Sequence, residues 1–180
     1  ARDAAGRVPG VAAISGQTFV ETLSNASSGA GKFFVVGFEP ETDFTVTPWL
    51  RGGRLDAPDG EENWAIVGDR ILVRKGETLR LYGTSFVVAG VLERTGMGMD
   101  WSVYIPDQGL RRMVAGSASK GERTLRIAER AASALLIRAA PGTDLLDLAE
   151  QIEQNVGGVQ VVLSSTVVSA AREQLHGATT

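Results

Sequence analysis

Short apolar runs separated by turn residues dominate the first two thirds of the chain, a pattern typical of β-strands. Val11–Ile14 follows the turn signal Pro9-Gly10 and predicts a strand. Residues 32–39 form a compact run of β-branched and aromatic side chains, which predicts a buried strand. The small, glycine-rich residues 24–32 between these two runs predict a loop or hairpin connection.

Residues 64–94 contain four apolar runs, separated by turn signals at residues 68–69, 75–77 and 83–84. A spacing of about 8 to 10 residues per strand predicts a small antiparallel sheet or barrel. Residues 47–63 precede these runs and contain three glycines and two prolines. They predict an ordered loop with a short helical turn.

The chain after residue 100 mixes strand and helix patterns. Residues 101–106 predict a strand ended by Pro106, and residues 107–116 predict a short helix with Asp107 as its cap. Residues 117–126 are polar and predict a loop. Residues 132–140 are rich in alanine, leucine and isoleucine, and we expect a strand there.

The clearest helix is predicted between residues 141 and 158. Four apolar residues fall at helical spacing on one face: Leu145, Leu148, Ile152 and Val156. Thr143 or Asp144 would cap the helix, and the glycines at 157–158 would end it. Residues 159–165 then predict a strand and residues 166–175 a closing helix, so the last third has a βαβ-like order.

The two chain ends share a weak internal similarity. Val8–Val20 aligns with Val156–Val168, with five of thirteen positions identical. We therefore predict an α+β chain in two subdomains. Residues 1–45 and 130–180 would form a βαβ-type subdomain, with residues 46–129 inserted as a β-rich one.

Composition narrows the classes of function. The chain has 180 residues, 43% of them hydrophobic, which is enough for a core and too many for a disordered chain. A net charge of −3 without any run of Lys and Arg argues against nucleic-acid binding. There is no cysteine and one histidine, His176, so thiol chemistry is excluded and a zinc site or Ser-His-Asp triad is disfavoured. No apolar run approaches the 18 to 20 or so residues of a membrane helix.

Motifs that carry chemistry are incomplete. The glycine-rich residues 28–32 lack the spacing of a phosphate-binding loop, and Gly83–Val87 lacks the last glycine of a nucleophile elbow. Ser117 and Lys120 match a Ser-x-x-Lys pair without its companion motifs, which predicts a surface loop. Two acidic clusters are interpreted as surface charge rather than as calcium loops: Glu39, Glu41, Asp43 and Asp56, Asp59, Glu61, Glu62.

Met97, Met99 and Trp101 place three large apolar side chains in one glycine-containing stretch before the strand at 101–106. Two interpretations stand side by side. Some of these side chains fold back onto the core, or they form an exposed contact for a partner, since methionine-rich surfaces adapt to different partners. A catalytic loop is the weaker third interpretation, because no acid–base set accompanies it.

The order of several motifs resembles the extracytoplasmic domain of ABC-transporter permeases of the MacB/FtsX/LolC type. The matching segments are the Pro-Gly-Val strand at 9–11, Gly37–Pro40, Gly53-Arg54, Ile66–Gly68, the glycine-spaced hairpin from Gly76 to Leu92, and the strand that ends in Tyr104-Ile105-Pro106. The resemblance spans nearly the whole chain. The region between Pro106 and Ala132 departs from it, because no long amphipathic hairpin for docking an adaptor is evident there.

The resemblance implies a non-catalytic module without a cofactor, on the extracytoplasmic face of the bacterial cell membrane. Membrane helices would precede Ala1 and follow Thr180. An ABC ATPase on another domain or chain would use ATP, and a dimer of permeases is left open. The module would couple motion of the membrane helices to export or handling of a substrate or partner, with Met97, Met99 and Trp101 as contact candidates.

Two rival classes remain open at the level of the sequence. Trp64, Trp101 and Tyr104 could stack on sugar rings, as in a carbohydrate- or cell-wall-binding β module. A hydrolase with an unusual Ser/Lys or Asp-based site would use Ser117.

Overall fold

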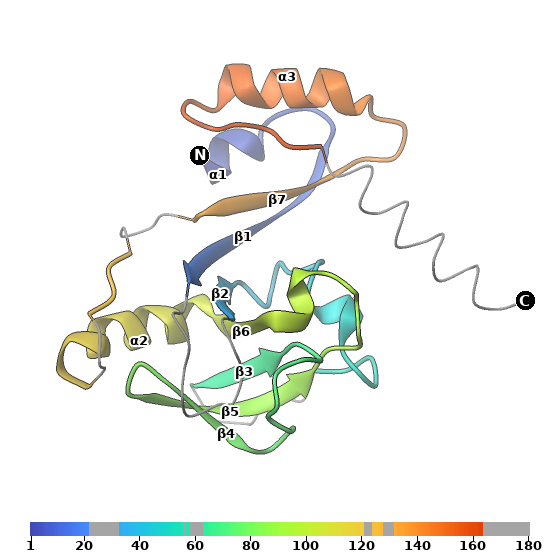
Figure 1. The fold of residues 1–180 in the computed structure, drawn as a ribbon. Coiled ribbons are helices and arrows are strands. Elements are labelled where there is room, and N and C mark those ends of the chain that lie inside the picture. The colour runs from blue at the N-terminus through green and yellow to red at the C-terminus, as the bar shows by residue number, and fades with distance from the viewer. Residues whose placement is uncertain (22–32, 56, 58–62, 121–123, 128–131, 164–180) are drawn as a thin grey trace, which may run out of the picture. The chain divides into compact units, whose positions relative to one another are not determined.

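In the part of the chain that is described, seven strands form one mixed sheet with the order β4-β5-β3-β6-β2-β1-β7 (Figure 1). The computed structural model describes residues 1–21, 33–55, 57, 63–120, 124–127 and 132–163. The strands are β1 Val11–Glu21, β2 Phe34–Phe38, β3 Trp64–Val67, β4 Thr78–Leu81, β5 Thr84–Val91, β6 Ser102–Pro106 and β7 Ala134–Ala139. The helices are α1 Arg2–Ala5, α2 Asp107–Lys120 and α3 Leu145–Asn155, with 3-10 turns η1 Thr47–Trp49 and η2 Gly98–Trp101. The predicted α+β class is confirmed.

The chain divides into two compact units. Residues 1–14 and 137–180 form the terminal unit, and residues 15–136 form the central unit. The division falls within β1 and β7, each of which continues from one unit into the other. The subdomain boundaries expected from the sequence, after residues 45 and 129, stay a prediction.

Strand pairing in the central unit is mixed, so the expected purely antiparallel arrangement is wrong. β2 pairs with β6 and β3 with β5 in parallel, whereas β3–β6 and β4–β5 are antiparallel. The cause is the apolar run at residues 71–73, which was expected to be a strand and is not one. The chain crosses instead to β4, and the β4–β5 hairpin then brings β5 beside β3 in the parallel direction.

The β4–β5 hairpin is confirmed, and its connection is a two-residue turn. Leu81 pairs with Thr84, and the two central residues, Tyr82 and Gly83, both have positive φ, at 46° and 77°. Such a turn has the twist that suits an antiparallel hairpin. Gly83 takes this conformation without steric cost, whereas Tyr82 is a non-glycine residue in the left-handed region.

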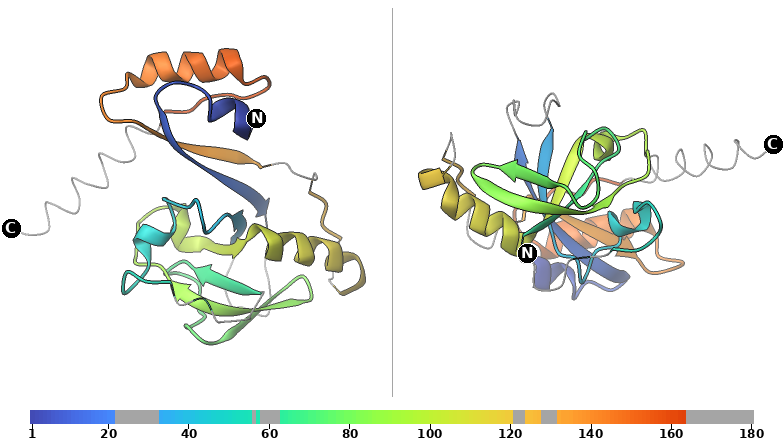
Figure 2. Two further views of the ribbon diagram at one scale, coloured as in Figure 1. Left: turned by 180° about the vertical axis from the view of Figure 1, so that it is seen from behind. Right: turned by 90° about the horizontal axis from the view of Figure 1, so that it is seen from below.

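The strands at the centre of the sheet are buried on both faces, which explains their continuous apolar sequences. On β2, Val35 packs on one face and Val36 on the other. On β6, Val103 and Ile105 share the face of Val35, and Tyr104 lies on the face of Val36. α2 covers the first face with Leu110 and Met113, and Figure 2 shows α2 alongside these strands from two further directions. The second face is covered by loop residues, among them Val46, Leu50, Leu92 and Met99.

α2 is longer than expected, since Ser117–Lys120 continues the helix where a polar loop was predicted. Met113 and Ser117 are both fully buried and lie one turn apart on the same face. The Ser117 hydroxyl donates to the Val114 carbonyl at 2.7 Å and accepts from the Leu125 N–H at 2.9 Å. The helix therefore continues because its last turn packs on the core and holds the segment that follows.

The terminal unit has its own small core. Leu148, Ile152 and Val156 of the α3 region pack with Ala5 and Val8, as their helical spacing predicted. Asp144 caps α3 by accepting from the N–H groups of Leu146 and Asp147, so the second of the two expected caps is the one used. Leu145 was expected on the buried face but is exposed.

The strand predicted for residues 159–165 is not formed over residues 159–163. The side chains of Val159 and Val161 pack against the terminal core as an alternating pattern would. The Val161 N–H, however, donates to the Glu153 carboxylate of α3 at 2.8 Å. A helix side chain thus takes a backbone donor that a strand partner would have used.

No helix within the described ranges has the length and apolar character needed to cross a membrane. Several predictions fall on residues outside those ranges. They are the glycine-rich loop at 24–32, the acidic residues Asp56, Asp59, Glu61 and Glu62, the closing helix at 166–175, and His176.

Candidate partner-contact loop

The loop before β6 separates the three apolar side chains that the sequence placed together. Trp101 is 46% exposed. Met97 and Met99 are both half-buried, and Met99 packs against the loop-covered core that contains Trp64 and Tyr104. Both interpretations of this stretch therefore apply to different residues: Met99 folds back onto the core, and Trp101 faces solvent.

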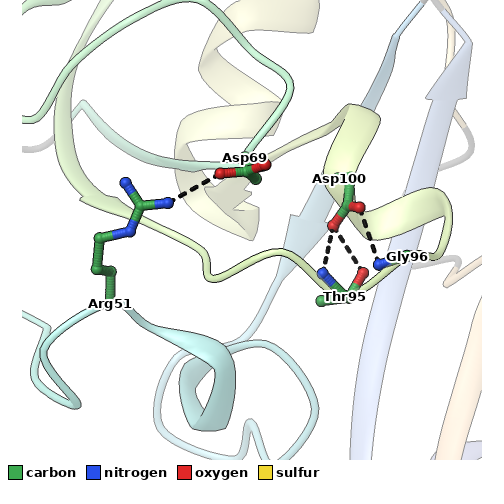
Figure 3. A network of polar contacts seen from close by, with 5 residues as sticks. All are labelled: Arg51, Asp69, Thr95, Gly96 and Asp100. Carbon is green, nitrogen blue, oxygen red and sulfur yellow. Dashed lines mark hydrogen bonds and ion pairs between the residues drawn. The ribbon is translucent and has the colours of Figure 1, made fainter. Parts of the chain in front are cut away.

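A buried carboxylate holds the loop in shape. Asp100 accepts from the Thr95 N–H at 2.8 Å, from the Thr95 hydroxyl at 2.7 Å and from the Gly96 N–H at 2.9 Å (Figure 3). The Thr95 hydroxyl oxygen in turn accepts from the Met97 N–H at 3.1 Å. Trp101 is thus presented by a turn whose polar groups bond within the turn itself.

These contacts determine the charge of Asp100. Burial raises the pKa of the Asp100 carboxyl, but the three hydrogen bonds from Thr95 and Gly96, together with the positive charge of Arg94, outweigh burial. The pKa consequently lies below the ordinary value of 3.8. Asp100 is a permanently charged brace at neutral pH, because hydrogen bonds to the ionised form favour that form.

The loop is also fastened to the end of β3. The Arg70 N–H donates to the Asp100 carbonyl and the Gly68 N–H donates to the Ser102 carbonyl, both at 2.9 Å. A side chain at Gly68 would collide with the Met99 carbonyl oxygen and would lie 2.5 Å from the Asp100 carbonyl group. Glycine is required here for close backbone approach, and the Ile66–Gly68 match to the family pattern falls on this position.

An aromatic cluster underlies the loop. Phe38 meets both Trp64 and Tyr104 edge to face, with ring centroids 6.0 and 6.2 Å apart. Burial, reinforced by the nearby charges of Asp43 and Asp100, raises the pKa of Tyr104 to about 12 even though a hydrogen bond with Ser102 opposes the shift. Tyr104 is therefore a neutral core residue at physiological pH.

Trp64 and Tyr104 do not present a sugar-stacking surface, because both side chains are buried. Of the three aromatic residues expected for a carbohydrate-binding module, Trp101 alone is exposed. That set is thus not brought together on one surface, and the structure corrects the prediction.

Two exposed aromatic residues that sequence reasoning missed lie close to the loop in strand register. Phe34 is 46% exposed and pairs with Ser102, the residue after Trp101. Phe19 is 47% exposed and pairs with Val36 on the neighbouring strand β1, which puts it on the same sheet face as Phe34. Strict alternation along residues 33–36 was the available signal, since Phe33 and Phe34 must face opposite ways.

The remaining chemical motifs have structural roles. Ser117 is buried within α2 rather than lying in a surface loop, and its hydroxyl is already engaged with Val114 and Leu125. Asp43 accepts from the N–H groups of Val46 and Thr47, as a turn cap does. Across the described ranges, no group of three or more His, Asp or Glu side chains is placed to hold a metal ion.

Residues 1–155 match the family of MacB-like periplasmic core domains. The chain belongs to this family. No curated protein sequence matches the chain. The resemblance that the motif order carried is thus confirmed, and the MacB-like domain of this chain is extracytoplasmic.

Two solved structures share the fold of this MacB-like domain. The extracellular domain of the noncanonic ABC-type transporter YknZ from Gram-positive bacteria has a TM-score of 0.53 at 10% identity, over 85% of this chain and 79% of that one. The periplasmic region of MacB from Actinobacillus actinomycetemcomitans has a TM-score of 0.51 at 12% identity, over 96% of this chain and 82% of that one. At these identities the comparison establishes the fold.

Proposed function

We propose that this MacB-like domain is the non-catalytic outer module of an ABC-transporter permease. It couples ATP-driven motion of the membrane helices to the export or handling of a substrate or partner outside the membrane. The match of residues 1–155 to the family is the observation that carries this proposal. ATP is used by a separate ATPase domain or subunit, which is the partner we expect through the rest of the permease.

The chemistry of the buried polar groups supports a non-catalytic role. The hydroxyl of Ser117 and the carboxylate of Asp100 each bond to backbone groups of this chain, and both interactions fasten a loop. A nucleophile or general base needs to reach a substrate instead. These two groups serve the rigidity that a module transmitting motion requires.

The contact surface that we propose consists of Trp101, Met97 and Phe34. Trp101 and Phe34 are large aromatic side chains left exposed beside a well-packed sheet. Exposed aromatic residues on a rigid support are typical of protein–protein contacts. Met99, the third residue expected from the sequence, would support this surface from below because it packs on the core.

The permease assignment is tested by the natural reading frame. We expect an apolar run of about 20 residues on each side of the 180-residue chain. An open reading frame with stop and start codons directly flanking this chain, and no such runs, would overturn the assignment.

The contact surface is tested by cysteine cross-linking in the intact permease. The chain has no cysteine, so Trp101→Cys can carry a single photo-cross-linker. Ser85→Cys, on an exposed position of β5, serves as the matched control. We expect a defined cross-linked partner from position 101 and none from position 85. Equal labelling from both positions would reject the surface.

A further inference from the structure

A groove in the central unit lies on residues that the proposed contact surface does not use. Its volume is about 670 Å³, within the range of small-molecule sites. The lining residues come from the loop after η1, the chain between β3 and β4, and β5: Arg51, Arg54, Asp69, Ile71, Leu72, Val73, Arg74, Lys75, Glu77, Gly90 and Val91.

The walls of this groove are tied together. The Arg51 N–H donates to the Val91 carbonyl at 2.9 Å, which joins the loop to β5. The Arg51 guanidinium contacts the Asp69 carboxylate at 2.8 Å across the groove (Figure 3). Ile71 is buried and anchors the third wall in the core. The groove is therefore built from segments that hold one another in place.

The groove is positive, although the chain as a whole carries a net charge of −3. Four cationic side chains line it against two carboxylates. Asp69 accepts from Arg51, and Glu77 accepts from the Arg74 N–H at 2.9 Å. Within the described part of the chain the exposed Arg74 guanidinium makes no ion pair. An anion would complement this excess of positive charge.

The groove also presents apolar surface. Leu72 is 76% exposed and is the most exposed large apolar side chain of the central unit's described part. It lines the groove together with Val73 and Val91. Leu72 belongs to the run that the sequence predicted as a strand, so its exposure is not a consequence of sheet packing. Exposing leucine to water has a free-energy cost that a bound acyl chain would recover.

We propose that this groove binds an anionic amphiphile, a molecule with one acyl chain and a phosphate or carboxylate head. The head lies near Arg74 and Arg51, and the acyl chain covers Leu72. The proposal goes beyond the proposed function, since it concerns a ligand of the central unit. Its test uses the 180-residue chain alone, so failure would leave the permease assignment standing.

Calorimetric titration below the critical micelle concentration tests the proposal with three probes. Dodecyl phosphate carries both features, dodecyltrimethylammonium has the same chain with the opposite charge, and inorganic phosphate supplies the charge without the chain. We expect dodecyl phosphate to bind at least tenfold more tightly than either of the others. Equal binding of the two dodecyl compounds, equal binding of the two phosphates, or no binding would each overturn the proposal.

Two substitutions localise the site. Arg74→Glu reverses the exposed charge and Leu72→Ser removes the apolar surface, and each should weaken dodecyl phosphate about tenfold or more. Arg70→Glu is the matched control, because Arg70 is exposed, close in sequence and outside the groove lining. Arg74 and Leu72 are exposed, so both variants should retain the wild-type melting temperature. Unchanged affinity in Arg74→Glu, or an equal loss in Arg70→Glu, would overturn the site.

Discussion

Gly68 lies so close to Asp100 that a Cβ atom at position 68 would stand 2.5 Å from the Asp100 carbonyl carbon and oxygen. Two backbone segments more than thirty residues apart in sequence are thereby pressed together at the end of β3. The same aspartate uses its side chain to hold Thr95 and Gly96. Gly68 and Asp100 together determine where Trp101 is presented.

Gly68→Ala should destabilise the domain, because the added methyl group meets backbone that cannot rotate away. Overpacking of this kind costs about 1–3 kcal/mol. Gly98→Ala is the matched control, since a Cβ there has nothing within 4 Å and the φ of Gly98 is not in the left-handed region. Urea unfolding of the two variants checks the difference. Equal stability would show that the loop moves aside freely.

Asp100→Asn should lower stability at neutral pH by on the order of 1–3 kcal/mol, because an amide cannot accept from all three donors of Thr95 and Gly96. The folded-state pKa of Asp100 is below 3.8. The stabilisation is therefore present above about pH 4 and is lost as the pH falls through the folded-state pKa. Unfolding curves from pH 7 to pH 2 should show the wild type approaching the variant. A constant gap throughout would contradict the assignment.

Tyr104 should titrate late. Its pKa of about 12 in the folded state exceeds the model value of 10.0. The stabilisation is complete below pH 10 and is lost as the pH rises from 10 toward 12. The chain has two tyrosines, so the difference in phenolate absorbance between the wild type and Tyr104→Phe isolates this residue. Ionisation at the ordinary pH while the protein is still folded would show that Tyr104 is hydrated.

Ser117→Ala should cost about 1–3 kcal/mol, since it leaves the Leu125 N–H without its acceptor. Hydrogen exchange at the Leu125 amide should accelerate along with the loss of stability. Ser119→Ala is the control on the same helix, because Ser119 is exposed and its hydroxyl donates to the Gly116 carbonyl at 3.3 Å. If the two variants exchanged alike at Leu125, the proposed fastening role of Ser117 would be wrong.

Met99→Ser should destabilise the domain more than Trp101→Ser does, although tryptophan is the larger side chain. Met99 packs on the core whereas Trp101 is 46% exposed, and burying a methionine contributes on the order of 1–2 kcal/mol more. Melting temperatures of the two variants check this order. The reverse order would mean that Trp101 is part of the core.

Periodicity alone carried the local structure where one residue type leaves few alternatives. The spacing of Leu148, Ile152 and Val156 specified the buried face of α3, and Asp144 specified its start. The apolar runs at β2, β3 and β6 specified buried strands. The order of glycine and proline motifs along the chain also pointed to the family, because such motifs mark turns and close approaches that a fold requires at given places.

Tertiary packing decided what periodicity could not. Residues 71–73 read as a strand, yet Ile71 is drawn into the core and Leu72 is left in the groove. Residues 117–120 read as a loop, yet Ser117 finds a buried partner in Leu125 that lies eight residues away. Each outcome depends on a contact between segments whose proximity only the folded chain creates.

The same distinction applies to the candidate site. Three neighbouring residues, Met97, Met99 and Trp101, could be identified from the sequence, because large apolar side chains among glycines are conspicuous there. Their division into a core residue and an exposed one, and the addition of Phe34, required the structure. The physical reason is that exposure depends on which neighbours the folded chain brings within van der Waals contact, and a linear pattern records only which neighbours are adjacent along the chain.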